Sequence, residues 1–218
     1  MLRLAHRGDW RRAPENTLEA LLAAIAVPGC DGVEFDVRLS RDGVPVLLHD
    51  DTLARAHRHH GRVGDLHVAE LHTYGIPTLA AVLGALPAGA FLDIELKGDD
   101  HGEATAAVLR GGRGPAPGRA VVSSFEPPTL AAMAGVLPGW TRWLNASDLR
   151  PETISLAAGL GCRGLSVLWG AITPAALRTA RSAGLEVAAW TVTRRPTYER
   201  LARLGVVAAC VEGAALDG

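Results

Sequence analysis

Two short segments of the sequence alternate apolar and charged residues in a pattern that could hold a metal ion. The charged residues recur at every second position and are Glu34, Asp36 and Arg38 in the first segment and Asp93, Glu95 and Lys97 in the second. Because side chains alternate between the two faces of a β-strand, each segment predicts a strand with one charged face. Carboxylates that converge inside a fold are costly to desolvate, and a hard divalent cation such as Mg²⁺ or Ca²⁺ would neutralise them.

An internal network of ion pairs is the alternative interpretation of these residues. Arg38 could pair with Glu34 or Asp36, and Lys97 could pair with Glu95. Either segment alone fits a network and a metal site about equally well. The two segments together, at one end of one fold, favour a metal site.

Two of the eight histidines stand out because each ends an extended segment. His6 ends the first predicted strand, and His49 ends an extended piece over residues 44–49. A pair of histidines can act as general acid and general base, since imidazole titrates near neutral pH. Arg7, beside the first histidine, offers a planar guanidinium that suits phosphate oxygens. A hydrogen-bonded pair of core histidines is the alternative.

Around these segments the chain repeats a short apolar strand followed by an amphipathic helix. This alternation predicts parallel strands joined by helical crossovers. About eight such units favour a single compact (β/α)8 TIM barrel over an open doubly wound sheet, because no GxGxxG motif follows the first strand. The predicted strands cover residues 2–5, 32–39, 91–97, 120–125, 141–145, 164–169, 186–192 and 207–212.

The predicted helices lie between these strands, and the first shows the 3.6-residue period of apolar positions most clearly. In that helix Asn16 is expected to be the N-cap, with Glu19 three residues later completing a capping box. Pro174 and Pro196 are expected to open two later helices. The predicted helices cover residues 17–27, 78–86, 104–110, 128–136, 152–158, 174–183 and 196–204.

A polar, histidine-rich stretch interrupts the alternation after the second strand. Residues 50–77 are too many for an ordinary βα loop, and we interpret them as a short insertion in a single domain over residues 1–218. The stretch follows the end of a strand, on the face where barrel enzymes place their chemistry. The remaining histidines are expected to be solvated surface residues, and they are His57, His59, His60, His67, His72 and His101.

The composition argues against several classes of protein. With 218 residues, 48% hydrophobic and 21% charged, the chain is an ordinary soluble domain with one substantial core. A net charge of -1 and 5% aromatic residues make nucleic acid a poor candidate partner. The three widely spaced cysteines indicate neither a zinc site nor disulfides. Because no signal peptide and no bilayer-spanning apolar run are present, we expect a cytoplasmic protein without stable membrane insertion.

The motifs, taken in order, resemble those of the glycerophosphodiester phosphodiesterases, within the wider group of phospholipase-C-like barrel phosphodiesterases. They are HRG at residues 6–8, PENT at 14–17, EFD at 34–36, HD at 49–50, IELK at 94–97 and WTV at 190–192. These motifs extend over nearly the whole chain. The resemblance implies metal-dependent hydrolysis of a small-molecule glycerophosphodiester to glycerol 3-phosphate and an alcohol.

The resemblance also implies a role for individual residues. The catalytic acid and base would be His6 and His49. The ligands of the divalent metal, Mg²⁺ or Ca²⁺, would be Glu34, Asp36 and Glu95. The residues that contact the substrate and its phosphate would be Arg7, Lys97, Glu15 and Trp190.

The chain departs from the family pattern at three places and keeps every position just named. Thr193 stands where Asn is usual, Asp93 stands where Asn is common, and Glu212 ends the last strand in place of a Thr-Asp sequence. Two other functions stay open: a lysophospholipase D-type cleavage of lipid headgroups, and a non-catalytic barrel that binds phosphorylated metabolites. For the lipid-directed function, the chain shows no obvious surface helix for docking. A non-catalytic barrel would typically have lost a histidine or a metal-binding acid. A phosphosugar isomerase fits a barrel but would not explain the HRG and EFD motifs.

Overall fold

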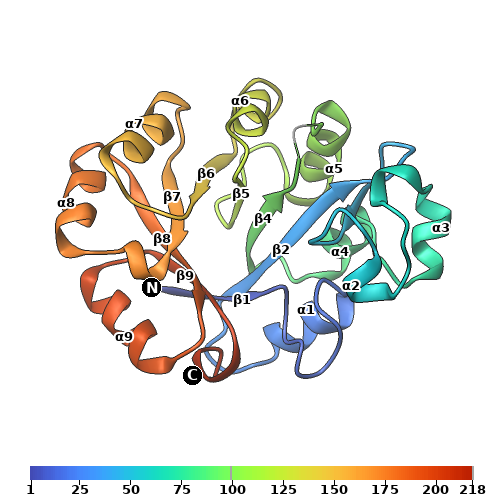
Figure 1. Cartoon of the computed structure of the whole chain (residues 1–218), viewed down its shortest axis with the longest axis horizontal. Helices are drawn as coiled ribbons and strands as arrows, with labels where there is room; N and C mark the ends of the chain where they lie inside the picture. The colour runs from blue at the N-terminus through green and yellow to red at the C-terminus, as the bar shows by residue number, and fades with distance from the viewer. Residues whose placement is uncertain (99, 218) are drawn as a thin grey trace.

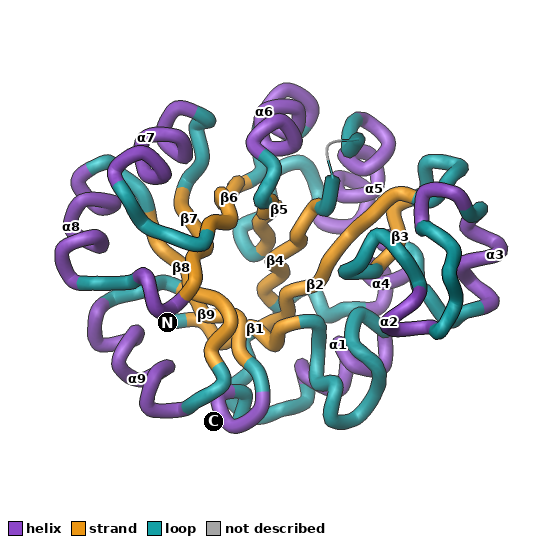
Figure 2. Tube along the Cα trace, viewed as in Figure 1, coloured by secondary structure: helices purple, strands orange, loops and turns teal. Residues whose placement is uncertain are grey.

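Parallel strands from the two ends of the chain pair with each other, and this pairing closes the sheet into a barrel. The computed structural model of the chain describes residues 1–98 and 100–217. The strands follow the order β1-β9-β8-β7-β6-β5-β4-β2, and β1 also pairs with β2 to complete the ring. Figures 1 and 2 show the helices arranged around this ring. The predicted (β/α)8 TIM barrel is therefore confirmed.

Each predicted strand is present, with its ends within one residue of the prediction. The extended piece predicted over residues 44–49 contains the strand β3, which pairs antiparallel with β2 and ends at Leu47, two residues before His49. Barrel strands are buried on both faces, and the outward residues Val33, Phe35 and Val37 are fully buried under the helices. The strands are β1 (Leu2–His6), β2 (Gly32–Leu39), β3 (Pro45–Leu47), β4 (Phe91–Leu96), β5 (Ala120–Ser124), β6 (Thr141–Ala146), β7 (Gly164–Leu168), β8 (Glu186–Val192) and β9 (Ala208–Val211).

The helices also follow the prediction, and four of them carry proline in the first turn, where a missing N–H is tolerated. Helix α8 begins at Pro174 as predicted, whereas α9 begins one residue before Pro196. The helices are α1 (Leu18–Ile25), α2 (Ala54–His57), α3 (Val68–Thr73), α4 (Leu79–Ala85), α5 (Glu103–Arg113), α6 (Pro127–Val136), α7 (Pro151–Gly159), α8 (Pro174–Ser182) and α9 (Arg195–Leu204). None of those within the described residues is long and apolar enough to span a bilayer.

The start of α1 differs from the prediction. Its N-cap is Thr17, whose side chain accepts a hydrogen bond from the backbone N–H of Ala20. Asn16 lies outside the helix with a φ of 56°, and it is buried in contact with Asp36. The predicted capping box of Asn16 and Glu19 is therefore wrong. Asn and Thr are both good N-caps, so only the tertiary contact of Asn16 separates the two possibilities.

The insertion over residues 50–77 forms local structure of its own. It contains α2, a short 3₁₀ helix (Val63–Asp65) and α3, which pack over a small apolar cluster. Three of its histidines are exposed as predicted, but His57 and His59 are half-buried because their rings lie against Tyr74. The buried members of the cluster are Val46, Leu48, Leu53, Val63, Leu71 and Ile76.

The inward side chains change character along the barrel axis. Near the N-terminal ends of the strands the interior is apolar, as at Leu4, Val121 and Trp143, which are buried in one cluster. Two residues further along the same strands stand His6, Ser123 and Asn145. Since side chains two apart share a face of a strand, a polar layer lies directly above the apolar one. Within the described residues, the apolar layer separates the polar layer from the N-terminal ends of the strands.

Candidate active site

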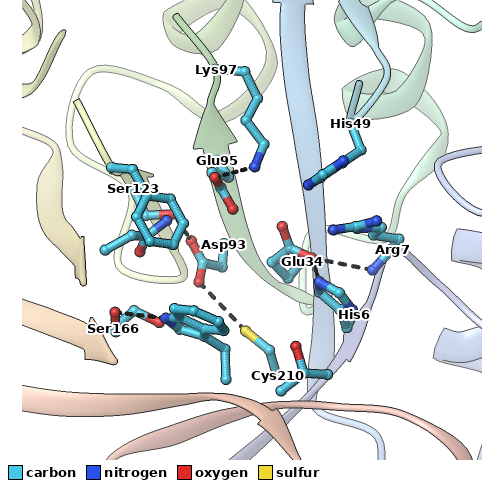
Figure 3. A pocket seen from close by; sticks show the side chains of 14 residues that line it. His6, Arg7, Glu34, His49, Asp93, Glu95, Lys97, Ser123, Ser166 and Cys210 are labelled. Atoms are coloured by element: carbon cyan, nitrogen blue, oxygen red, sulfur yellow. Dashed lines mark hydrogen bonds and ion pairs between the residues drawn. The ribbon is translucent and has the colours of Figure 1, made fainter. Parts of the chain in front are cut away.

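The C-terminal ends of the strands surround a cavity of about 180 Å³. In Figure 3 the labelled charged side chains and the small polar side chains face each other across it. The cavity is lined by His6, Arg7, Glu34, His49, Asp93, Glu95, Lys97, Ser123, Phe125, Asn145, Ser166, Trp190, Thr191 and Cys210. We call one set of residues the charged rim: His6, Arg7, Glu34, Asp36, His49, Glu95 and Lys97. We call a second set the polar floor: Asp93, Ser123, Asn145 and Ser166.

Three carboxylates of the charged rim converge on one point. One oxygen from each of Glu34, Asp36 and Glu95 lies within 4.8 Å of the others, and the three residues are 3%, 0% and 8% exposed. The pairing of β2 with β4 places Asp36 directly opposite Glu95. This is the convergence that the alternating segments predicted. The donor set is all oxygen, which suits a hard divalent cation.

Two cations compensate part of this negative charge. Lys97 Nζ lies 2.5 Å from Glu95 Oε1 and 3.1 Å from Asp36 Oδ1, and Arg7 Nε lies 3.0 Å from Asp36 Oδ2. Burial alone would raise the pKa of Asp36, but Lys97 and Arg7 hold that pKa below its ordinary value. Asp36 is therefore the best compensated carboxylate of the three.

Glu34 and Glu95 are less well compensated. Burial raises the pKa of Glu34 well above its ordinary value, and neighbouring Asp36 and Glu95 add to that shift. Burial and Asp36 also raise the pKa of Glu95. Glu34 Oε1 is buried without a hydrogen-bond partner among the described residues. The ion pairs alone thus leave negative charge uncompensated at the point where the three acids meet. They also leave Glu34 Oε1 without a hydrogen-bond donor.

Arg38 does not form the ion pair with Glu34 or Asp36 that the sequence allowed. Its Nε donates a hydrogen bond to the backbone carbonyl of His49 at 2.8 Å. Within the described residues, Asp36 pairs with Arg7 and Lys97 instead, and Glu34 lies near the His6 ring. The alternative pairing of Lys97 with Glu95 is present, in addition to the contact of Lys97 with Asp36.

The HRG turn holds Arg7 in an unusual backbone conformation. Arg7 has a φ of 59°, and its backbone N–H donates to the carbonyl of Glu34 at 2.8 Å. Gly8 follows with a φ of 88°, and a Cβ there would lie 2.6 Å from the backbone carbon of Ala20. Only glycine allows the turn to pack so closely on α1. Strained residues of this kind are concentrated at functional sites.

Asn16 of the PENT motif contacts a carboxylate rather than capping a helix. Its Nδ2 donates to Asp36 Oδ2 at 2.9 Å, and its Oδ1 accepts from the backbone N–H of Asp36 at 3.1 Å. The two bonds fix the orientation of Asp36 beneath Arg7. The motif therefore helps to position one candidate metal ligand.

Each histidine of the rim is oriented by a carboxylate. His6 Nδ1 lies 2.5 Å from Glu212 Oε1, and its Nε2 lies 3.8 Å from Glu34 Oε2. His49 Nδ1 lies 2.6 Å from Asp50 Oδ1. Burial lowers the pKa of His49, although Asp36 and the bond to Asp50 partly offset that shift. The Nε2 atoms of the two rings make no hydrogen bond within the described residues, and the two side chains line the same cavity.

A chain of ion pairs links His49 back to the HRG turn. Asp50 Oδ2 accepts from Arg55 Nε at 2.6 Å, and Arg55 Nη2 donates to Glu15 Oε1 at 2.6 Å. Glu15 Oε1 also accepts from Arg7 Nη1 at 3.3 Å. Glu15 was expected to contact the substrate, but it holds two arginines and is not among the residues that line the cavity.

Two aromatic residues form one wall of the cavity. Trp190 lies edge-on to Phe125, with their ring centroids 5.4 Å apart, and Trp190 Nε1 donates to the backbone carbonyl of Ser166. Lys97 Nζ lies 5.7 Å from the Phe125 ring centroid. Trp190 thus lines the cavity, and its contact with the substrate stays a prediction.

The polar floor contains Asp93, the acid that stands where Asn is common in the family. Asp93 Oδ1 accepts from Ser123 Oγ at 2.6 Å, and burial raises the pKa of Asp93 to about 7. Asp93 Oδ2 is approached by Cys210 Sγ at 3.9 Å. Asp93 is not one of the three converging metal-ligand candidates, although it lines the same cavity and stands opposite Glu34 in the pairing of β2 with β4.

The prediction of a solvated His101 is wrong. This residue is 2% exposed, and its ring nitrogens bond to Thr105 Oγ1 and to the backbone carbonyl of Lys97, each at 3.1 Å. Burial lowers the pKa of His101. It is a structural support for the strand end that carries Lys97. Its position just before a helix concealed this role, because Thr105 lies one helical turn further along.

The partner of His6, Glu212, is a residue of the candidate site that the sequence pattern did not reveal. Glu212 follows β9, and it meets His6 only because β9 pairs with β1 across the closure of the barrel. An acid after the last strand was visible as a departure from the family pattern. Its contact with His6 depends on the closed ring.

The whole chain resembles proteins of one family. A model of the "Glycerophosphoryl diester phosphodiesterase family" matches residues 6–214. A glycerophosphodiester phosphodiesterase of Caldanaerobacter subterraneus subsp. tengcongensis is 28% identical, over 93% of this chain and 90% of its own length. Glycerophosphodiester phosphodiesterase 1 of Rattus norvegicus is 51% identical over 63 residues, which are 29% of this chain and 19% of the rat protein.

A solved structure shares both the fold and part of the sequence. It is a phosphodiesterase from Oleispira antarctica in complex with the product sn-glycerol-3-phosphate. Its TM-score with this chain is 0.84 at 29% identity, and the match covers 97% of this chain and 92% of that chain.

Proposed function

Because the chain belongs to the glycerophosphoryl diester phosphodiesterase family, we propose that it hydrolyses glycerophosphodiesters to glycerol 3-phosphate and an alcohol. The observation that carries this proposal is the charged rim, in which three buried carboxylates, two cations and two histidines meet at one end of the barrel. A phosphoric diester hydrolase needs charge stabilisation and proton transfer at one phosphorus atom. We also propose that residues 1–218 act as one catalytic domain, with residues 50–77 as its short insertion.

Glu34, Asp36 and Glu95 would hold the divalent metal, which we propose is Mg²⁺ or Ca²⁺. The unpartnered and buried Glu34 Oε1 supports this assignment, because it needs a positive group that the described residues do not supply. Burial and the repulsion of neighbouring carboxylates raise the pKa values of Glu34 and Glu95. These shifts also indicate that positive charge is lacking at this point. When bound, the metal supplies positive charge that polarises the phosphoryl oxygens.

Arg7 and Lys97 would bind the phosphate of the substrate. Both side chains line the cavity, and both are held by Asp36 at its edge. Asp36 and its neighbours keep the pKa of Lys97 raised despite burial, so the ammonium stays charged at neutral pH. Preorganised cations stabilise the charge that builds up on phosphorus without reorganising during the reaction. Glu15 supports this role by holding Arg7.

His6 and His49 would carry the protons. One imidazole would take the proton from the attacking hydroxyl, either of water or of a neighbouring substrate hydroxyl, and the other would protonate the leaving alkoxide. Glu212 and Asp50 fix the two ring orientations through the Nδ1 atoms. Trp190 would form the wall against which the substrate packs.

The test is an assay of the purified protein on a panel of glycerophosphodiesters, with products identified by ³¹P NMR. We expect glycerol 3-phosphate to be released in the presence of Mg²⁺ or Ca²⁺, and activity to disappear in excess chelator and return when metal is added back. Full activity in excess chelator would contradict the metal site. Failure to cleave any glycerophosphodiester with either metal would contradict the proposed function.

A further inference from the structure

Arg55, from the insertion, joins the acid that orients His49 to the acid that holds Arg7. Its Nε donates to Asp50 Oδ2 and its Nη2 donates to Glu15 Oε1, each at 2.6 Å. Asp50 and Glu15 carry like charges and do not attract each other, so the cation between them keeps both in place. Because the donors of a guanidinium are fixed in one plane, the two bonds also set the spacing of the two carboxylates.

The local structure gives the Arg55 side chain a fixed starting point. Leu53 is fully buried in the apolar cluster of the insertion, and helix α2 begins at the next residue. None of the four described residues of α2 is buried, and a single helical turn is not stable by itself. Leu53 therefore anchors this turn to the insertion, and the bond from Arg55 to Glu15 attaches it to the loop after β1.

We infer that Arg55 is a positioning residue for the reaction, which sets the placement of one proton-carrying histidine and one phosphate-binding arginine together. It acts on His49 through Asp50, whose Oδ1 lies 2.6 Å from His49 Nδ1. It acts on Arg7 through Glu15, whose Oε1 also accepts from Arg7 Nη1 at 3.3 Å. The inference rests on the proposed function, because His49 and Arg7 have their roles from it.

The exposure of these groups indicates that Arg55 contributes to position more than to stability. Its side chain is 51% exposed, and those of Asp50 and Glu15 are each 25% exposed. Ion pairs this accessible to water stabilise a fold only slightly. Burial alone would raise the pKa of Asp50, but the hydrogen bonds with Arg55 and His49 lower that pKa to about 2. The bond from Arg55 likewise lowers the pKa of Glu15 against the effect of burial, so both acceptors stay ionised at neutral pH.

The experiment measures kcat and KM for a glycerophosphodiester in the presence of Mg²⁺ or Ca²⁺. Asp50→Asn should lower kcat with little change in KM, Glu15→Gln should raise KM, and Arg55→Met should do both. We expect kcat/KM of Arg55→Met to fall about 10–100-fold, as for loss of hydrogen bonds to charged groups, with a melting temperature near that of the wild type. A loss of folded protein would lower kcat alone.

The matched control is Arg62→Met, which removes the arginine of an exposed ion pair with Asp51 in the same insertion. It should keep the kcat and KM of the wild type. Wild-type values of both constants in Arg55→Met, or equal losses in Arg62→Met and Arg55→Met, would overturn the inference.

A mutant cycle separates a positioning role from a merely structural one. With Arg55 present, the loss of kcat/KM in the double variant Asp50→Asn, Glu15→Gln should be smaller than the product of the single losses by at least about threefold, because each single change already releases the shared arginine. In the Arg55→Met background the same two losses should multiply to within about twofold. Losses that multiply with Arg55 present, or a coupling that persists in Arg55→Met, would overturn the inference.

A second variant keeps the cycle decisive if thermal denaturation shows that Arg55→Met does not fold. Arg55→Gln keeps a polar side chain at this exposed position and removes the charge, and it takes the place of Arg55→Met with the same expected and contradicting results. Absence of turnover by the wild type would instead overturn the proposed function and this inference with it.

Discussion

The charged rim and the polar floor of one cavity treat their buried polar atoms in opposite ways. In the rim, Asp36 is paired with Arg7 and Lys97, and each histidine is paired with its own carboxylate. In the floor, Asn145 Oδ1 is left without a partner among the described residues. The rim is thus organised by its own ion pairs, whereas the floor keeps an unpaired acceptor. Changes in the rim should therefore lower turnover, and a change at Asp93 of the floor should appear in stability.

The largest effect is expected when the metal-binding acids of the rim are changed. Glu34→Gln keeps the size of the side chain but removes a charge that the metal requires. We expect turnover to fall on the order of 10³-fold or more, equivalent to several kcal/mol of lost charge stabilisation. The melting temperature should stay near that of the wild type, and Glu199→Gln on the exposed face of α9 should be silent. Wild-type turnover by Glu34→Gln would remove the metal site from this account.

Loss of a histidine of the rim should cause the next largest fall in turnover. His6→Ala or His49→Ala should each reduce kcat by about 10²-fold or more. The double variant should lose far less than the product of the two single losses, because acid and base act as a unit. His60→Ala, an exposed histidine of the insertion, is the control and should have little effect. A silent His6→Ala would contradict the mechanism.

Substitution of a carboxylate that orients a histidine should reduce turnover less. Asp50→Asn weakens a bond that raises the pKa of His49, so that pKa should move further below its ordinary value. We expect turnover to fall about 10–100-fold, as for loss of a hydrogen bond to a charged group. NMR titration of His49 measures the pKa, and Asp51→Asn, at the exposed neighbouring acid, is the control. A raised His49 pKa in Asp50→Asn would show that the carboxylate does not act in this way.

A change at Asp93 of the floor should appear in stability as a function of pH. Burial raises the pKa of Asp93 from 3.8 to about 7 in the folded state, so its protonated form favours folding. That contribution is complete below pH 3.8 and is lost as pH rises to about 7. In metal-free protein, Asp93→Asn should gain stability relative to the wild type across this window, by up to about 4 kcal/mol above pH 7. Urea unfolding at pH 5 and pH 8 tests this, and a stability difference that is the same at both pH values would contradict it.

The sequence pattern predicted most of the rim because its signals are local. Alternation within β2 and β4 puts Glu34, Asp36 and Glu95 on one face. His6 ends β1 and His49 follows β3 by two residues, and both line the cavity. The barrel itself follows from the repeated strand and helix units. These features require only the period of the strands and the direction of the crossovers.

The remaining parts of the site depend on contacts between distant segments. Glu212 meets His6 across 206 positions of sequence, and this contact exists only because β9 and β1 close the ring. Asn16 lies outside the helix because its amide donates a hydrogen bond to Asp36. His101 is buried because its ring bonds to the backbone carbonyl of Lys97. Local propensity carries no information about these contacts. The partners of a buried polar group are therefore what the sequence left undetermined.

The claim that the three acids of the rim hold a metal needed for the reaction is tested most directly by one set of rates. Release of glycerol 3-phosphate from a glycerophosphodiester is measured for the wild type in excess chelator and again after Mg²⁺ or Ca²⁺ is added back. We predict that the wild-type rate is lost with chelator and returns with the metal, whereas the rate of Glu34→Gln stays low in both conditions. A wild-type rate that does not change in excess chelator would contradict this claim.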